Sequence, residues 1–328
     1  MKAIAYTRTG PAAEVLQLVD LPTPEPGPGE VRVRVRWSGV NPSDVKSRAG
    51  LRTKTLAFAQ IVPHSDGAGE IDAVGAGVGA ERIGQSVWLW NGAWQRAHGT
   101  AAQWIVLPAA QAVPLPPGVS GEAAACLGIP ALTALHAVLM DGGVAGKRVL
   151  VAGGAGAVGH YAVQFARKLG AAQVVATVSS EAKAQLATSA GADATIDYKR
   201  DDVAACVAAL TEKAGFDRIV EVDAAANLAS DLALLAPGGD VAIYGSGAAE
   251  VALPFFPAIV RNATLRCFIV YNLAKADRER AIATLTPWLA RGELQHNVFE
   301  RLSLAECARA HEIVESGRAI GNVVLRVD

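Results

Sequence analysis

The sequence has no apolar run that approaches the ~20 residues a helix needs to span a bilayer. Its first ten residues, MKAIAYTRTG, also lack the apolar stretch of a signal peptide and suit a first β-strand. We therefore expect no membrane-spanning segment and a cytoplasmic location.

Charge of one sign does not dominate either. The 30 basic and 31 acidic residues give a formal net charge of −1 over 328 residues. This balance provides no bulk electrostatic attraction to nucleic acid or to an anionic membrane surface. We expect neither of them as a partner.

Cysteine is scarce, and its spacing is informative. The four cysteines are Cys126, Cys206, Cys267 and Cys307, and no two of them lie at the short spacing of a zinc knuckle or a redox pair. A structural zinc lobe, which needs four closely spaced cysteines, is thereby excluded. We expect four reduced and mostly buried thiols.

The chain does have a large apolar fraction, 51%, which suits two domains of ordinary size. In residues 31–36 Val and Arg alternate with the period of two of a half-buried strand. Residues 22–29 are rich in proline and glycine and predict an irregular connector. Glycines between residues 67 and 79 suit tight turns between short strands, as in a small irregular barrel.

From residue 120 the pattern changes. Residues 120–140 are rich in alanine and leucine and predict one or two helices. Strands and helices then alternate, which implies βαβ units with right-handed crossovers and a doubly wound parallel sheet. The expected strands are 148–152, 173–178, 194–196, 217–222, 240–244 and 264–270, and the expected helices are 158–169, 181–190, 202–213 and 228–235.

A glycine-rich turn joins the first of these strands to its helix. Gly154, Gly156 and Gly159 satisfy the pattern G-x-G-x-x-G, which is specific for a dinucleotide when it follows a strand and opens a helix. The first glycine permits the tight turn, the second lets backbone approach a pyrophosphate, and the third lets the helix pack close to the strand. The helix N-terminus then offers N–H groups and the positive end of its dipole to the phosphates.

The residues that follow predict which dinucleotide binds. NAD sites usually hold the ribose 2′-hydroxyl with an acidic residue about 20 positions after the turn. Here that place holds Ser179 and Ser180, which can donate hydrogen bonds to a 2′-phosphate, and Lys183 adds positive charge one helical turn later. Glu181 is the exception, and either caps its helix or binds a ribose. We expect NADPH rather than NADH.

Together with other motifs, these residues resemble the quinone oxidoreductase branch of the medium-chain dehydrogenase/reductase superfamily, close to zeta-crystallin. The resemblance runs almost end to end. Its further marks are residues 39–44, 62–71, 236–239, 244–246, 310–312 and 321–325. The resemblance implies an α/β protein in which a doubly wound parallel Rossmann sheet, residues 124–271, is inserted into a GroES-like β-barrel catalytic domain of residues 1–123 and 272–328.

The resemblance also implies a set of cofactor and substrate contacts. Those expected at the pyrophosphate are Gly154, Ala155, Gly156, Ala157, Val158 and Gly159, and those at the 2′-phosphate are Ser179, Lys183, Tyr198 and Arg318. Those expected along the ribose and nicotinamide are Asn227, Tyr244, Gly245 and Ser246, with Cys267, Phe268 and Ile269 closing over the ring. Asn41 and Thr133 match polar residues near the nicotinamide and substrate. Lys46 also belongs to the expected contacts and stands where relatives often carry tyrosine.

The same resemblance predicts that no metal takes part. Zinc alcohol dehydrogenases of the superfamily use Cys in the slot held here by Asn41, and Gly-His-Glu where this chain has His64-Ser65-Asp66. A neutral amide is a poor zinc ligand, and we expect His64 to be a buried, hydrogen-bonded histidine. Without a metal, hydride passes most readily to a quinone or an α,β-unsaturated carbonyl, because their charge delocalises onto oxygen. Hydrogen bonds from Asn41 or Thr133 would stabilise that charge.

We therefore expect an NADPH:quinone oxidoreductase. An enoyl or alkenal double-bond reductase is an alternative within the same class. An NADPH-binding protein with a structural or RNA-binding role is an alternative from another class, and a zinc alcohol dehydrogenase is a fourth. The resemblance further implies a homodimer or homotetramer that pairs through the strand expected at residues 264–270.

Overall fold

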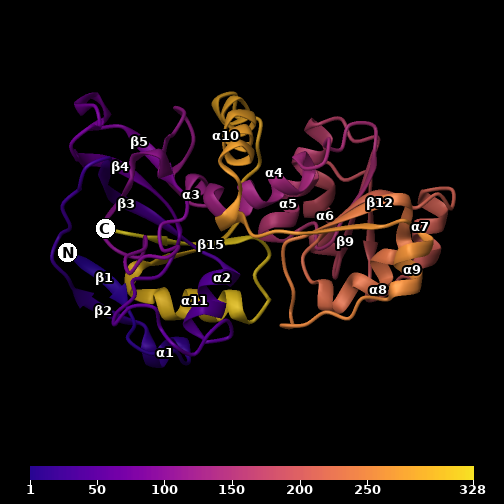
Figure 1. Cartoon of the computed structure of the whole chain (residues 1–328), viewed down its shortest axis with the longest axis horizontal. Coiled ribbons are helices and arrows are strands. Elements are labelled where there is room, and N and C mark those ends of the chain that lie inside the picture. The colour runs from indigo at the N-terminus through magenta and orange to yellow at the C-terminus, as the bar shows by residue number, and fades with distance from the viewer. The chain divides into compact units, whose positions relative to one another are not determined.

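The computed structural model describes residues 1–328 and divides the chain into two compact units (Figure 1). The terminal unit contains Met1–Ile129 and Thr286–Asp328, and the central unit contains Pro130–Leu285. Both boundaries fall inside helical segments, and both lie further along the chain than the limits of 124 and 271 expected from the sequence.

The terminal unit is built on a seven-stranded sheet. Its strand order is β14-β15-β3-β4-β5-β7, and β6 pairs with β3. Only β14 and β15 pair in parallel. The strands are β3 (Glu30–Val40), β4 (Asp66–Val74), β5 (Ser86–Leu89), β6 (Trp104–Pro108), β7 (Ala112–Pro114), β14 (Val298–Ser303) and β15 (Asn322–Arg326). The last two bring the C-terminal end of the chain beside β3, which carries the Val/Arg alternation.

Shorter elements surround this sheet. A separate antiparallel pair is formed by β1 (Lys2–Ala5) and β2 (Gln17–Asp20). The α-helices are α1 (Ala12–Val15), α2 (Pro42–Arg48), α3 (Gly121–Ala124) and α11 (Cys307–Glu315), and the 3-10 turns are η1 (Ala80–Arg82), η2 (Ala109–Gln111) and η5 (Leu304–Glu306). The helix α11 packs against α1, α2 and β15.

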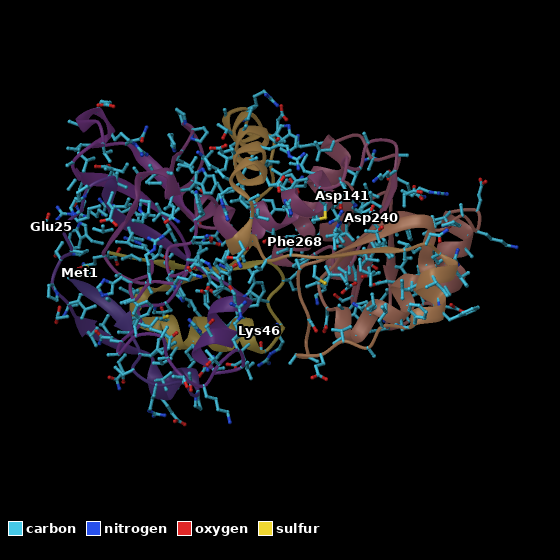
Figure 2. All side chains as sticks on the ribbon, viewed as in Figure 1. Met1, Glu25, Lys46, Asp141, Asp240 and Phe268 are labelled. Atoms are coloured by element: carbon cyan, nitrogen blue, oxygen red, sulfur yellow. The ribbon has the colours of Figure 1, made fainter.

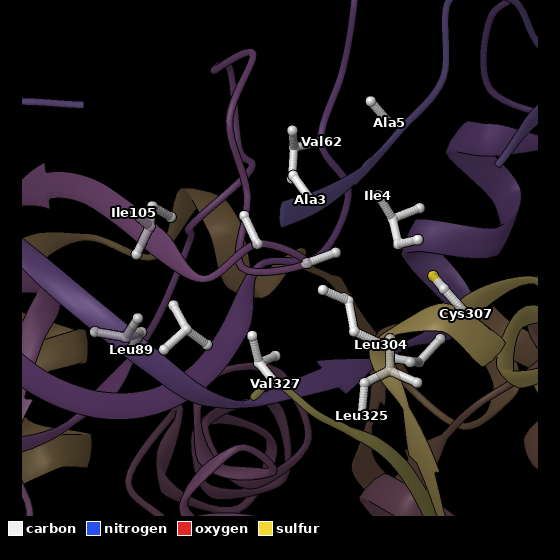
Figure 3. Packing of buried hydrophobic residues seen from close by; sticks show 14 of the residues in the cluster. Ala3, Ile4, Ala5, Val62, Leu89, Ile105, Leu304, Cys307, Leu325 and Val327 are labelled. Atoms are coloured by element: carbon white, nitrogen blue, oxygen red, sulfur yellow. The ribbon is translucent and has the colours of Figure 1, made fainter. Parts of the chain in front are cut away.

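The core of the terminal unit combines residues from both chain ends. Ile4 from β1, Ile105 from β6 and Leu325 from β15 are at most 2% exposed and belong to one apolar cluster (Figure 3). Cys307 at the start of α11 points into the same cluster and is fully buried. The C-terminal residues are therefore an integral part of this unit.

The central unit is a parallel sheet of six strands in the order β10-β9-β8-β11-β12-β13. All its strand pairs are parallel. The strands are β8 (Arg148–Val151), β9 (Gln173–Val178), β10 (Ala194–Asp197), β11 (Phe216–Glu221), β12 (Leu235–Ile243) and β13 (Thr264–Cys267). This order, with β8 at the point where the winding reverses, confirms the doubly wound sheet.

Helices connect these strands. The α-helices are α4 (Leu132–Leu139), α5 (Ala157–Lys168), α6 (Glu181–Ser189), α7 (Val203–Leu210), α8 (Ala224–Leu234) and α9 (Phe255–Val260), followed by the 3-10 turn η4 (Val270–Asn272). Two segments cross the unit boundaries, the π-helical turn η3 (Leu127–Ala131) and α10 (Lys275–Ala290). The contacts of α4 with α5 and of α5 with α6 form one group, and those of α7, α8 and α9 form another, which suits helices on both faces of the sheet.

Most of the expected elements of this unit occur within a few residues of their predicted limits. The strand expected at 264–270 is shorter, because the chain leaves the sheet after the Phe268 N–H donates to the Ile243 carbonyl and turns into η4. The segment 120–140 is interrupted by η3, which contains Pro130. None of the helices has the length and apolar character required to cross a membrane. All four cysteines are free, and Cys267 is exposed.

Candidate cofactor site

The turn between β8 and α5 is held by main-chain hydrogen bonds to neighbouring strands. The Ala152 N–H donates to the Val220 carbonyl at 3.0 Å, and the Gly154 N–H donates to the Thr177 carbonyl at 3.0 Å. The Gly153 N–H donates to the Thr177 hydroxyl at 3.1 Å. The turn is thus fixed against β9 on one side and β11 on the other.

Each glycine in this turn has its own steric reason. The left-handed backbone conformation in this turn belongs to Gly153, which precedes the motif and has a φ of +67°. A Cβ on Gly154 would lie 2.4 Å from the Cβ of Ala176 in β9. A Cβ on Gly159 would lie 2.2 Å from the Gly153 carbonyl oxygen, so this glycine lets the helix pack against the turn.

The helix that follows presents its N-terminus at this turn. The first intrahelical hydrogen bond runs from the His160 N–H to the Gly156 carbonyl. The N–H groups of Ala157 and Val158 precede that bond, so they lie among the donors that a helix leaves unpaired at its start. Such a terminus favours an anionic group.

The ends of β9 and β10 carry a second polar group. Ser179 follows β9, and the Nζ of Lys183 lies 3.0 Å from its hydroxyl oxygen. Tyr198 follows β10, and its N–H donates to the Val178 carbonyl, which places it next to Ser179. Ser180 is the N-cap of α6 and accepts from the Lys183 N–H, so Glu181 does not serve as the cap. Because β8, β9 and β10 are adjacent parallel strands, the turn after β8 and the ends of β9 and β10 all lie at the carboxyl edge of the sheet.

The end of β11 forms a third group, centred on the buried Glu221. Its Oε1 accepts from the Asn227 side chain at 3.0 Å and from the Asp223 N–H. Its main-chain carbonyl accepts from the Tyr244 N–H at 3.1 Å. Burial, followed by the charge of Glu221, raises the pKa of Tyr244. Asn227 and Tyr244, both expected along the nicotinamide half, therefore share one anchor.

The segments after β12 and β13 come together with α4. A Cβ on Gly245 would lie 2.2 Å from the Val222 carbonyl oxygen, so the chain passes close to the end of β11 here. The Phe268 ring lies 4.8 Å from the His136 ring and 6.4 Å from the Tyr244 ring, centroid to centroid (labelled Phe268 in Figure 2). Thr133, one turn before His136 on α4, is 4% exposed. Ser246 lies next to Gly245, while Cys267 and Ile269 flank Phe268.

Three of the predicted residues belong to the terminal unit. Asn41 is the N-cap of α2, Lys46 lies on α2 (labelled in Figure 2), and Arg318 is exposed after the end of α11. They are thus in a different unit from Ser179, Lys183 and Thr133.

Asn41 is held by two buried acids. Its side-chain nitrogen donates to Asp66 Oδ2 at 2.9 Å, and its N–H donates to Asp44 Oδ2 at 2.8 Å. The Ile129 N–H donates to the same Asp66 oxygen at 3.0 Å. Burial raises the pKa of Asp44 to about 7 and raises that of Asp66 well above its usual value. These carboxyl groups were not among the predicted site residues, although Asp44 and Asp66 lie in the two motifs that carried the resemblance.

The structure also brings together three residues that sequence analysis did not connect. His64, Cys307 and His311 are each 0% exposed, and one ligand-type atom from each lies within 4.8 Å of the others. The Nε2 atoms of His64 and His311 are 2.9 Å apart and hydrogen-bonded. The Cys307 sulfur lies 3.8 Å from His64 Nε2. His64 is buried and hydrogen-bonded, as expected. No pattern in the sequence links it to residues about 240 positions away.

Two family models match the chain. Residues 27–117 match the alcohol dehydrogenase GroES-like domain, and residues 157–288 match the zinc-binding dehydrogenase domain. The first lies within the terminal unit, and the second covers most of the central unit.

Individual relatives cover the whole chain. A quinone oxidoreductase of Pseudomonas aeruginosa is 32% identical over 329 residues, covering 99% of each chain. A solved NAD-dependent alcohol dehydrogenase is 32% identical with a TM-score of 0.92 and covers 100% of both chains. A mycobacterial protein solved in complex with NADPH is 30% identical with a TM-score of 0.87 and covers 99% of both chains.

Proposed function

The chain belongs to the quinone oxidoreductase branch of the medium-chain dehydrogenase/reductase superfamily, and on that premise we propose that it is an NADPH-dependent, zinc-independent quinone reductase. As a member of this branch it is an oxidoreductase that uses a nicotinamide cofactor. The similar protein of Pseudomonas aeruginosa is a quinone oxidoreductase, and the mycobacterial one binds NADPH. A similar solved structure is an NAD-dependent alcohol dehydrogenase, so similarity alone does not decide between NADPH and NADH or between acceptors. The residues of the site must support that choice.

The observation that supports NADPH most directly is the pair Ser179 and Lys183 at the end of β9. Their side chains are 3.0 Å apart, so a hydroxyl and an ammonium group face one small space. An acidic residue, which would repel a 2′-phosphate, is missing from this position. Glu181 is exposed in the first turn of α6, where a carboxylate stabilises the positive end of the helix dipole.

The cradle for the diphosphate also fits. Gly154 and Gly159 leave no space for a Cβ, so the turn closes tightly against β9 and α5. The N–H groups of Ala157 and Val158 stand at the start of α5. These residues would hold the diphosphate, while Asn227, Tyr244 and Phe268 would border the nicotinamide half.

When bound, NADPH supplies a hydride to the acceptor. Thr133 would donate a hydrogen bond, and keep its proton, at the acceptor oxygen, where negative charge develops. Asn41 gives one of the two hydrogens of its side-chain nitrogen to Asp66, which fixes the direction of the second N–H toward the reacting groups in this proposal. The single proton that completes the reduction comes from solvent in this scheme.

The residues that replace the catalytic zinc ligands of relatives do not fit that ion. Zinc prefers thiolate, imidazole and carboxylate ligands. The Asn41 side chain instead directs an N–H donor at Asp66, and the Ser65 hydroxyl accepts from the Ala93 N–H at 3.3 Å. Of these three residues only Asp66 carries a group that zinc prefers, because Asn41 offers an amide and Ser65 a hydroxyl. One such ligand does not make a zinc site, so no step through zinc is proposed.

The exposed surface of the central unit supports self-association. The edge strand β13 pairs only with β12, and α9, which precedes it, exposes Phe255 at 67% and Phe256 at 72%. An unpaired edge beside exposed aromatic side chains suits pairing with a second copy. We propose a homodimer that forms through β13.

The test of the activity is a steady-state screen of NADPH oxidation with 1,4-benzoquinone, 9,10-phenanthrenequinone, 2-hexenal and a crotonyl thioester, with NADH run in parallel. We expect quinone turnover with NADPH that exceeds both the rate with NADH and the rate with the two enones. The variant Thr133→Val, which keeps the shape of the side chain, should lose about 10- to 100-fold in kcat. Faster reduction of the enones, or equal rates with both dinucleotides, would contradict the proposal.

A further inference from the structure

A continuous series of hydrogen bonds crosses the interior of the terminal unit. His311 Nε2 lies 2.9 Å from His64 Nε2, and His64 Nδ1 lies 2.9 Å from the Ser38 hydroxyl oxygen. The Ser38 hydroxyl lies 2.8 Å from that of Thr100, which bonds to the Asp66 main-chain carbonyl. Ser38, His64, Thr100 and His311 are each 0% exposed, so no water competes for these contacts.

The last contact fixes the direction of the whole series. A carbonyl oxygen only accepts, so the single hydroxyl hydrogen of Thr100 is directed to Asp66. Thr100 then has none left, and Ser38 must donate to Thr100. Ser38 in turn has no hydrogen for His64, so His64 must carry its proton on Nδ1 and donate to Ser38. Any other assignment would place two lone pairs opposite each other at 2.8–2.9 Å.

The same reasoning determines which ring nitrogen carries the proton in His64 and in His311. Burial lowers the pKa of His64 to about 3 and holds that of His311 well below its usual value, so both rings are neutral. A neutral His64 with its proton on Nδ1 accepts at Nε2, and His311 must therefore donate from Nε2. His311 Nδ1 is then a bare acceptor, and it is buried without a hydrogen-bond partner.

His64 occupies a backbone conformation that favours glycine. Its φ is +76°, a left-handed value that costs a residue with a Cβ about 1 kcal/mol or more. Zinc-dependent members of the superfamily carry glycine in this place of the motif. The strain at His64 is therefore offset by the two hydrogen bonds that its ring makes within the series.

Two members of the series, Ser38 and Asp66, are connected to Asn41. Ser38 lies in β3 three positions before Asn41, and its neighbour Gly39 is the register partner of Asp66 in β4. Asp66 receives the Thr100 hydrogen bond on its main chain and holds the Asn41 amide with its carboxyl group. The series thus fixes the two strands at the point where Asn41 leaves the sheet.

We propose that Ser38, His64 and His311 are positioning residues that fix the Asn41 side chain through this one-directional series of hydrogen bonds. The proposal deepens the proposed function and depends on it for the part that concerns turnover. It adds a role for α11, whose His311 begins the series more than 240 positions away from His64 in the sequence.

A metal ion is the other occupant that His64, Cys307 and His311 suggest. Zinc bonds of 2.0–2.1 Å to nitrogen require roughly 3.3 Å between two ligand nitrogens in a tetrahedral site. The two Nε2 atoms are 2.9 Å apart and share a hydrogen, which a metal would have to displace. The raised pKa of the buried Cys307 thiol also opposes the thiolate form that binds a metal. The geometry therefore points to the hydrogen bond.

The first arm of the test reads the tautomers directly. Nitrogen-15 NMR of the histidine rings distinguishes protonated from bare ring nitrogens, and single substitutions assign the six histidines. We expect a proton on Nδ1 of His64 and on Nε2 of His311 in the full-length protein. The reverse assignment for either ring, or a mixture of tautomers, would overturn the inference whether or not the protein reduces quinones.

The second arm measures coupling to Asn41. Ser38→Ala should lower kcat with a quinone about 10-fold and leave KM for NADPH within about twofold. The same substitution in an Asn41→Ala background should have no further effect, because the two act through one contact. The control Leu107→Ala opens a cavity in the same core without touching the series, and should lower stability while kcat stays unchanged.

Two substitutions of His64 distinguish the cost of its backbone strain from its role in positioning Asn41. His64→Gly removes the ring and also the steric cost of the positive φ, so it should be more stable than His64→Ala. Both variants should show the loss in kcat. A wild-type kcat for His64→Gly or Ser38→Ala, or additive effects with Asn41→Ala, would overturn the positioning role. Absence of quinone turnover in the wild-type protein would instead contradict the proposed function and leave the tautomer result standing.

Discussion

The turn after β8 is shaped almost entirely by main chain, whereas the segment after β3 depends on buried polar side chains. In the first, glycines allow close approach of β8, β9 and α5, and the hydrogen bonds run between N–H and carbonyl groups apart from one to the Thr177 hydroxyl. In the second, Asn41 is held by Asp66, which is itself fixed by Ile129 and Thr100. Substitutions that add side-chain volume should therefore disturb the turn after β8, and substitutions that remove polar atoms should disturb the segment after β3.

The largest effect is expected at the main-chain site. Gly159→Ala places a Cβ 2.2 Å from the Gly153 carbonyl oxygen, so the turn must shift. We expect NADPH affinity to fall by more than about 100-fold, which corresponds to roughly 2.7 kcal/mol. Isothermal titration calorimetry measures the NADPH affinity of the variant and of the wild type.

The control for that variant is Gly156→Ala. Its Cβ would meet nothing closer than the Gly153 carbonyl oxygen at 3.2 Å, so the free protein should keep its thermal midpoint. Any loss of NADPH affinity then reports the close approach of the diphosphate alone. Equal destabilisation of the free protein by both variants would contradict the steric account of this turn.

A smaller effect is expected at the end of β9. The double variant Ser179→Asp, Lys183→Ala removes the ammonium group and adds a carboxylate that faces the ribose. NADPH affinity should fall about 10- to 100-fold while NADH affinity stays the same or improves. Fluorescence titration with each dinucleotide gives the ratio. An unchanged ratio would place the 2′-phosphate elsewhere.

A buried acid next to the end of β11 should make the stability of the central unit depend on pH. Asp231 on α8 is buried, and its carboxyl group is hydrogen-bonded to Glu221. Burial, followed by the charge of Glu221, raises the pKa of Asp231 from 3.8 to about 8. The folded protein then holds a proton that the unfolded chain releases near pH 4, so the free energy of unfolding decreases as pH rises from about 4 to about 8. Asp231→Asn keeps a donor toward Glu221 and removes this titration.

We expect Asp231→Asn to be more stable than the wild type by about 1–3 kcal/mol above pH 8, with little difference near pH 4. Urea unfolding across this range measures the two profiles. Parallel profiles at every pH would show that the Asp231 proton is not released on unfolding.

The smallest change in the folded unit itself is expected at its surface. Phe256→Glu replaces a side chain that is 72% exposed, so the stability of the single chain should change by less than about 0.5 kcal/mol. The proposed dimer should nevertheless dissociate, because a charge would enter its interface. Light scattering coupled to size exclusion measures the mass, and a variant that keeps the wild-type mass would exclude this surface as the interface.

The same contrast explains how far sequence analysis reached. The parallel sheet and the glycine turn were predictable because their signals are local: a strand, three glycines and a helix are contiguous. The series Ser38, His64, Thr100 and His311 was not predictable, because four distant segments meet only in the folded terminal unit. The positive φ of Gly153 was not predictable either, because two adjacent glycines can both adopt it and the pattern does not distinguish them.

The measurement that tests the central claim most directly is a crystal structure of this protein grown with NADPH. The account predicts the diphosphate against the main chain of residues 155–158 and the 2′-phosphate beside Ser179 and Lys183. It also predicts that no metal gives anomalous scattering beside Asn41. An empty turn after β8, or a transition metal bound next to Asn41, would contradict it.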